Sequence, residues 1–258
     1  MLRYSIPLTP TTVFWWITSV SDRYMISAIL GSEANSIYTV ANKLPTMLTL
    51  LSVILMQAWQ YSAVREAKNS LQGQVEFYSN VWLALLSALF LICSAMVALV
   101  KVEIRILADA AYFEAWQYTP VLCAAMLFCG FNSFMGSVYS VKRRSGLSLG
   151  TSLLGAGVNV GLNALLIPSP MGIQGASLAT LVSYVVVFMV RARNARRLIP
   201  FRLFKKELVF CTIILTAQIL FISFGWKGWQ AVQVGACGAI FLISGKQLIE
   251  KIRALRRR

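Results

Sequence analysis

The 258-residue sequence contains no histidine and only nine acidic residues. The lack of histidine removes the side chain that most often serves as a catalytic base or metal ligand near neutral pH. The five cysteines all lie inside apolar runs, without the spacing of a metal site or a disulfide framework. The GxSxG, P-loop and HExxH motifs are also missing. These absences predict a protein that is not an enzyme and needs no metal or cofactor.

Apolar residues, by contrast, are abundant: 58% of the chain is hydrophobic and 13% is charged. Soluble domains carry more charge and lack apolar runs of about 20 residues, the length of a membrane-spanning helix. The composition therefore predicts an all-α, polytopic membrane protein with eight transmembrane helices. The expected spans are 7–30, 36–63, 78–100, 118–141, 147–167, 172–190, 207–225 and 229–245.

The net charge of +15 would suggest a nucleic-acid partner in a soluble protein. Here most of the 24 lysines and arginines fall in the termini and in one set of alternate loops. The opposite set of loops holds only Lys101, Arg105 and Lys227. This asymmetry predicts that both termini are cytoplasmic and that the charge serves membrane orientation, with no nucleic-acid partner.

The basic segment 191–206 divides the expected spans into two groups. We expect a six-helix bundle over 1–190, a polybasic cytoplasmic linker over 191–206, and two further helices with a basic tail over 207–258. The linker either contacts anionic lipid or serves only as a topology anchor. On the opposite side, the mixed apolar and charged segment 101–117 predicts an interfacial helix.

The second expected span contains a lysine, Lys43, among many leucine, valine, isoleucine and methionine residues. A lone ammonium group in hydrocarbon costs about 2.5–3.5 kcal/mol on insertion scales. Lys43 is therefore expected to face protein or a water-filled cavity. Other polar side chains fall within about 60° of Lys43 on a helix: Ser36, Thr39, Thr46, Gln57 and Tyr61.

The first expected span contains the one acid that lies well inside any span, Asp22. Asp22 and Lys43 are expected at similar depth on consecutive helices. They either form a fixed ion pair or line a cavity and exchange partners with a ligand or ion during transport. Arg23 points about 100° away from Asp22 and either flanks the cavity or neutralises this acid. The side chains expected on the face of Asp22 are Thr11, Trp15, Thr18 and Ser19.

The fifth and sixth expected spans carry small and amide residues at helical spacing. Asn159 and Asn163 lie one turn apart, and Gly157 and Gly161 form a GxxxG pattern that allows close helix approach. Together with Gly175 on the next helix, these residues predict contacts between packed helices.

Four segments, in order across about residues 5–190, resemble a known group of membrane transporters. They read TTVFWWITSVSDRYMI, GSEANSIYTVANKLP, QAWQYSA and NVGLNALLIPSPMGIQGASLATLVSY. The group is the polysaccharide transporter branch, with its Wzx-like flippases, of the multidrug/oligosaccharidyl-lipid/polysaccharide exporter superfamily. Its members have two six-helix bundles around a central cavity, sometimes with two added C-terminal helices. The resemblance implies that this chain is the second bundle plus those two helices, either as a fragment or beside a separate N-terminal bundle.

The resemblance also implies a substrate, an undecaprenyl-pyrophosphate-linked oligosaccharide. The substrate would be moved across a bacterial plasma membrane by alternating access. Lys43 is then expected to attract the pyrophosphate and Asp22 to couple transport to an ion. Two alternatives remain, a cation-coupled small-molecule or drug exporter of the same superfamily and a non-transporting membrane scaffold. The remaining residues expected to contact substrate are Trp15, Trp16, Arg23, Gln57 and Gln60.

Overall fold

The computed structural model describes residues 8–66, 70–226 and 228–255, and this part of the chain contains helices and no strand. The helices are α2 (Leu8–Leu30), α3 (Ser32–Ala41), α4 (Lys43–Glu66), α5 (Leu71–Leu107), the 3-10 helix η1 (Ala110–Gln117), α6 (Thr119–Val141), α7 (Ser145–Leu166), α8 (Gly172–Leu198), α9 (Lys205–Ser223) and α10 (Trp229–Leu255).

Five helices, α5 to α9, are long and apolar enough to cross a membrane. A sixth span results if α3 and the first part of α4 count as one bent segment, and the apolar part of α10, Trp229–Ile243, is shorter. The described residues therefore form a helical membrane protein, as the composition predicts. The expected number of eight spans goes beyond the five or six that helix length and hydropathy support.

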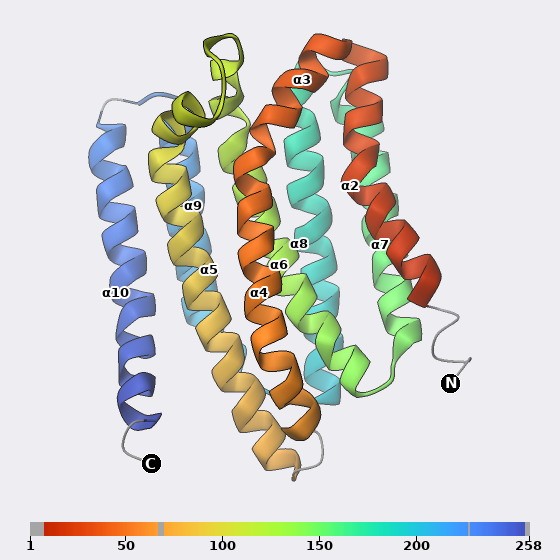
Figure 1. The fold of residues 1–258 in the computed structure, drawn as a ribbon, viewed down its shortest axis with the longest axis vertical. Coiled ribbons are helices and arrows are strands. Elements are labelled where there is room, and N and C mark those ends of the chain that lie inside the picture. Colours follow the sequence, from red (N-terminus) through yellow and green to blue (C-terminus); the bar gives the residue numbers. More distant parts are fainter. Residues whose placement is uncertain (1–7, 67–69, 227, 256–258) are drawn as a thin grey trace.

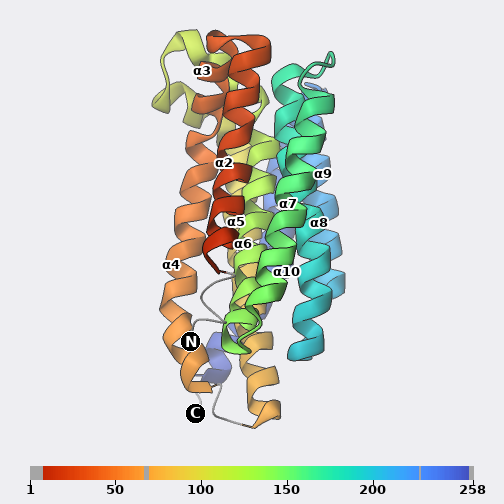
Figure 2. The same ribbon diagram turned by 90° about the vertical axis from the view of Figure 1, so that its right-hand side faces the viewer.

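The helices other than α3 and η1 lie side by side with their long axes nearly parallel (Figures 1 and 2). The α2–α3 turn, η1 and the α9–α10 turn lie at one end, here called the upper end, and α2 begins and α10 ends at the other, the lower end (Figure 1). Helix α6 packs against α4, α5 and α8, while α2 packs on α7, and both α9 and α10 pack on α5. This order leaves α2 on the opposite side of the bundle from α10 (Figure 1).

The second expected span is two helices, because the chain bends by 41° between α3 and α4. The side-chain amide of Asn42, at the break, donates to Tyr38 O at 2.9 Å. Pro45 lies in the first turn of α4, where its missing N–H removes no hydrogen bond from the helix interior. At the other end of α3, Gly31 adopts a positive φ of 95° that a side chain would disfavour. These two turns set the direction of α3 against α2.

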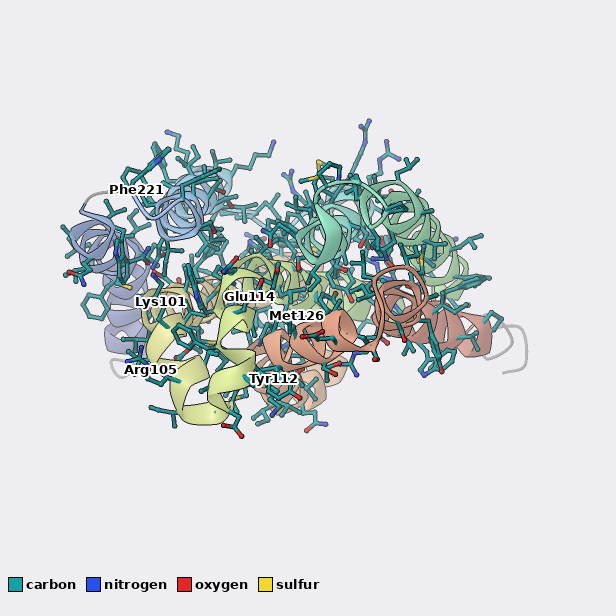
Figure 3. The ribbon with its side chains drawn as sticks, turned by 90° about the horizontal axis from the view of Figure 1, so that it is seen from above. Lys101, Arg105, Tyr112, Glu114, Met126 and Phe221 are labelled. Carbon is teal, nitrogen blue, oxygen red and sulfur yellow. The ribbon has the colours of Figure 1, made fainter. Side chains whose placement is uncertain are left out.

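The structure also corrects the expected interfacial helix over 101–117. Residues up to Leu107 continue α5, and a separate 3-10 helix, η1, follows. Lys101, on α5, lies at the upper end of the bundle (Figure 3). Its Nζ atom lies 4.1 Å from the ring centre of Trp116 in η1 and 4.6 Å from that of Trp229 in α10. Lys101 thereby ties three elements together at the upper end.

The expected polybasic linker is shorter than 191–206, because α8 continues to Leu198 instead of ending at Val190. The segment that follows is packed against α5. Trp82 Nε1 donates to Leu203 O at 2.9 Å, and the Arg202 amide donates to Ser79 Oγ at 2.9 Å. The remaining connection is therefore held on the bundle rather than extending away from it.

A buried polar contact joins the last two helices to α5. Ser94 Oγ donates to Gln218 Oε1 of α9, and Gln218 Nε2 donates to Ser94 O, each at 2.9 Å. Gln233 Nε2 of α10 donates to Gln218 O at 2.9 Å. Because these bonds cross between helices in an apolar setting, they fix the positions of α9 and α10.

Candidate functional site

A cavity of about 270 Å³ lies between α2, α4, α6 and α8. These helices are neighbours in the bundle, with α8 behind α4 and α2 (Figure 1). Its lining combines ionisable, hydroxyl and aromatic side chains. The lining residues are Trp15, Thr18, Ser19, Asp22 and Arg23 of α2, Tyr38, Asn42, Thr46 and Thr49 along α3 and α4, Met126 and Cys129 of α6, and Thr180 and Tyr184 of α8.

Asp22 is the centre of a hydrogen-bond network at this cavity. Its Oδ2 atom accepts from Tyr38 OH at 2.8 Å and from Thr180 Oγ1 at 2.7 Å. Its Oδ1 atom accepts from Asn163 Nδ2 at 2.6 Å. Asn159 extends the network, because its Oδ1 atom accepts from Asn163 at 3.2 Å and its Nδ2 atom donates to Thr180 at 3.3 Å. Four helices thus converge on one carboxyl group.

All of these partners of Asp22 are neutral, although the Asp22 side chain is only 4% exposed. A buried ionised carboxylate without a positive partner is costly, so such a group takes up a proton or binds a cation. The Oδ1 atom of the adjacent Asn163 is buried without a hydrogen-bond donor. The network therefore offers oxygen atoms to a small cation beside the carboxylate. Within the described residues, no group of three His, Cys, Asp or Glu side chains is placed to hold a metal ion.

Lys43 does not join this network. Its side chain is exposed and lies outside the cavity lining. The interpretation of Asp22 and Lys43 as a fixed ion pair is therefore wrong for the described structure. The physical reason is the break at Asn42: it ends α3 just before Lys43, so that Tyr38 rather than Lys43 is directed at Asp22.

The other residues expected to contact substrate divide between the cavity and the outer surface. Trp15 and Arg23 line the cavity. Trp16 is 59% exposed and Gln57 is also exposed, and neither belongs to the lining. The side chain of Gln60 lies outside the described residues. The polar face of α4 therefore does not continue into the cavity toward its lower end.

Some of the residues expected to pack helices together lie at a close helix contact, and others do not. A methyl group added at Gly157 or Gly161 would meet no described atom within 4 Å, so this GxxxG pattern does not mediate a close contact here. At Gly175 an added Cβ would lie 2.6 Å from Leu166 O, so α7 and α8 do approach closely there. Asn159 and Asn163 are buried and bind the Asp22 network, which gives them a polar role beyond packing.

Several site residues were missed by sequence reasoning, among them three that bind Asp22 or line the cavity beside it. Tyr38 and Thr180 bind Asp22, and Tyr184 lines the cavity. A tyrosine or threonine in a span does not by itself indicate a binding site, because such a residue packs between helices as often as it binds a ligand. Arg191 was assigned to the basic linker, yet it is buried in α8. Its signal was available, since a helix that starts at Gly172 needs only one more residue beyond Val190 to contain Arg191.

A second, larger groove of about 450 Å³ lies between α6, α8 and α9. No ionisable side chain is among its lining residues, which are mainly aliphatic and aromatic. It therefore lacks the groups that could bind an ion. The Asp22 cavity is the better candidate for a functional site.

Comparisons with protein-family models, with curated proteins and with solved structures gave no match to this chain. The resemblance to polysaccharide flippases therefore stays a prediction from the sequence.

Proposed function

We propose that this chain is one half of an ion-coupled flippase for an undecaprenyl-pyrophosphate-linked oligosaccharide in a bacterial plasma membrane. Asp22 is the coupling residue, which binds a proton or a small cation at the upper end and releases it as the helices move. The substrate class is that implied by the resemblance, and the coupling role is supported by the geometry of the cavity.

The observation that supports this proposal best is the environment of Asp22. Ionisable residues inside membrane helices are rare and commonly mark ion or proton pathways. Asp22 has only neutral partners, and it lies beside a cavity rather than in sealed protein. If position 22 served only for packing, burying asparagine or leucine there would cost less free energy than burying aspartate. An exchangeable proton or cation explains why a carboxyl group is present.

The cavity itself is too small for a lipid-linked oligosaccharide, since sites for drug-sized ligands already measure about 300–1,000 Å³. We therefore assign the cavity to the coupling ion. The substrate path lies along the exposed side of α2 and α4, which a second six-helix bundle would cover. Trp16, Lys43 and Gln57 are exposed on these two helices and would face that path.

The test is polymer export in a strain that depends on this chain, with the full-length variant quantified in the membrane. Asp22→Asn keeps the size and most hydrogen bonds of the side chain but removes its negative charge. We expect this variant to be present at normal level and to abolish export. Glu33→Gln, which neutralises an exposed acid in the first turn of α3, is the matched control and should export normally. Normal export by Asp22→Asn would refute the coupling role.

The second candidate is a cation-coupled small-molecule exporter of the same superfamily. It is favoured by one observation, the cavity volume of about 270 Å³, which is close to the lower limit of about 300 Å³ for small-molecule sites. The same export assay separates the two candidates. Lys43→Ala should abolish polymer export by a flippase, whereas it should leave a small-molecule exporter active.

A further inference from the structure

Arg191 of α8 is a second buried charge in the bundle, and the mechanism described above does not use it. Its side chain is only 3% exposed. Nε donates to Thr151 Oγ1 at 2.9 Å, and the terminal nitrogens donate to Asn132 O at 2.9 Å and to Ser152 Oγ at 3.2 Å. Gly136 provides the necessary space, because a Cβ atom there would lie 3.0 Å from the guanidinium.

No acid balances this charge among the described residues that contact it. The hydrogen-bond acceptors are two hydroxyl groups and a main-chain carbonyl. The rings of Trp15 and Tyr139 also lie near this charge, with centres 5.3 and 5.9 Å from the guanidinium carbon. A guanidinium is a permanent cation at physiological pH. The bundle therefore holds a fixed, uncompensated positive charge.

Arg191 lies below the Asp22 network, on the same helix, α8, as Thr180. Thr180, which binds Asp22, precedes Arg191 by eleven residues, or about 16 Å of helix. Trp15 stands between the two levels. Its ring lines the Asp22 cavity, contacts the Tyr184 ring with centres 5.7 Å apart, and faces the guanidinium.

A small void lies next to the Asp22 cavity and shares part of its lining. It measures about 10 Å³, close to the room that one water molecule needs. Trp15, Thr18 and Tyr184 belong to the linings of both spaces. The void also borders Ser152, whose hydroxyl binds Arg191. An ion that moved from Asp22 toward the lower end by this side would therefore have to pass the Trp15–Tyr184 contact and then the guanidinium.

We propose that Arg191 is an electrostatic barrier that prevents a cation held at Asp22 from crossing to the lower end of the bundle. This inference rests on the proposed coupling role of Asp22. Fixed arginines exclude cations and protons from the pores of other membrane proteins. A cation about 6 Å from the guanidinium, at an effective dielectric constant of about 20, would have its occupancy lowered about a hundred-fold. Without such a barrier, the ion gradient would dissipate without transport.

The test uses the full chain, purified and reconstituted into liposomes with an imposed proton or sodium gradient. Entry of each ion is followed with a pH-sensitive or sodium-sensitive dye. Arg191→Gln should increase entry of the coupling ion at least ten-fold over the wild type. Arg191→Lys, which keeps the charge but loses the forked hydrogen bonds, should stay close to the wild type. Arg193→Gln removes an exposed charge from the same helix and is the matched control, with no expected change.

Two further variants separate a barrier from a purely structural role. Adding Asp22→Asn to Arg191→Gln should abolish the leak, because the ion would lose its binding site on the path. Ser152→Asp neutralises the guanidinium without removing it and should leak as Arg191→Gln does. This variant carries the test if Arg191→Gln does not fold.

Any of three results would overturn the barrier. The charge-neutralising variants that fold admit the coupling ion no faster than the wild type, Arg191→Lys admits it as fast as Arg191→Gln, or the leak persists when Asp22→Asn is added. The liposome assay needs no polymer export. Normal export by Asp22→Asn together with an Asp22-dependent leak in Arg191→Gln would therefore refute the coupling of export to Asp22, while the leak would still show that Arg191 blocks an ion bound at Asp22.

Discussion

Thr180→Val is the sharpest test of the Asp22 network as a unit. Valine has nearly the shape of threonine, so the change removes a hydroxyl group and creates almost no space. In the structure this hydroxyl donates to Asp22 Oδ2 at 2.7 Å and accepts from Asn159 Nδ2 at 3.3 Å. The substitution therefore disconnects α8 from both α2 and α7 at one point.

The expected loss of stability follows from what these two bonds contribute. Interhelical hydrogen bonds in membrane proteins average about 0.6 kcal/mol and reach about 1.7 kcal/mol. The bond to Asp22 is short and both residues are buried, so we place it near the upper value, and the longer bond to Asn159 adds little. We expect Thr180→Val to lower the free energy of unfolding by about 1–2 kcal/mol. Asp22 keeps Tyr38 and Asn163 as partners, which limits the loss.

The assay is unfolding of the purified full chain in detergent micelles by sodium dodecyl sulfate, followed by circular dichroism. Thr212→Val is the matched control, because that hydroxyl donates to Leu208 O of its own helix, and we expect a loss below about 0.5 kcal/mol. A double-mutant cycle with Asp22→Asn should give a coupling energy of about 1 kcal/mol. A stability for Thr180→Val equal to that of the wild type, or strictly additive effects of the two substitutions, would show that the network is not a unit.

Two further predictions concern the packing of the helices. Gly175→Ala should destabilise the chain by about 1–3 kcal/mol in the same unfolding assay, because the new methyl group would overlap Leu166 O. Gly157→Ala enters open space and should instead stabilise α7 by up to about 1 kcal/mol; equal effects at both positions would contradict the observed approach of α7 and α8. Gln218→Leu removes the bonds between Ser94 and α9 and should cost about 1–2 kcal/mol, with faster proteolysis in segment 199–204. Proteolysis at the wild-type rate would show that apolar contacts alone hold α9 and α10.

Expectations from sequence were most accurate where hydropathy alone decides the structure. The apolar runs predicted an all-helical membrane protein because a chain in lipid must satisfy its backbone hydrogen bonds within each segment. They were least accurate at helix ends, where α5 and α8 both continue past the expected boundary. Charged side chains end an apolar run in the sequence, but they do not end a helix. Lys101 lies inside α5 and is half-buried, and Arg191 lies inside α8 and is buried.

The site itself was predictable only in part. Asp22 stands out in the sequence because an acid inside a span demands a physical explanation, and the structure places it beside a cavity with Trp15 and Arg23. The helical-wheel argument for Lys43 assumed one straight helix over 36–63. The 41° bend at Asn42 makes that assumption invalid, since a helical wheel does not describe how side chains are oriented across a break in the helix.

The sequence by itself determined the helical membrane class of the chain and singled out Asp22 as a candidate site residue, because hydropathy and charge act locally and are carried by single residues. Only the tertiary structure decided which partners Asp22 has. Tyr38, Asn163 and Thr180 come from three different helices, and the bend between α3 and α4 selects Tyr38 over Lys43. It also decided that Arg191 is buried, because burial depends on how α6, α7 and α8 pack around it and not on the residues beside it in the chain.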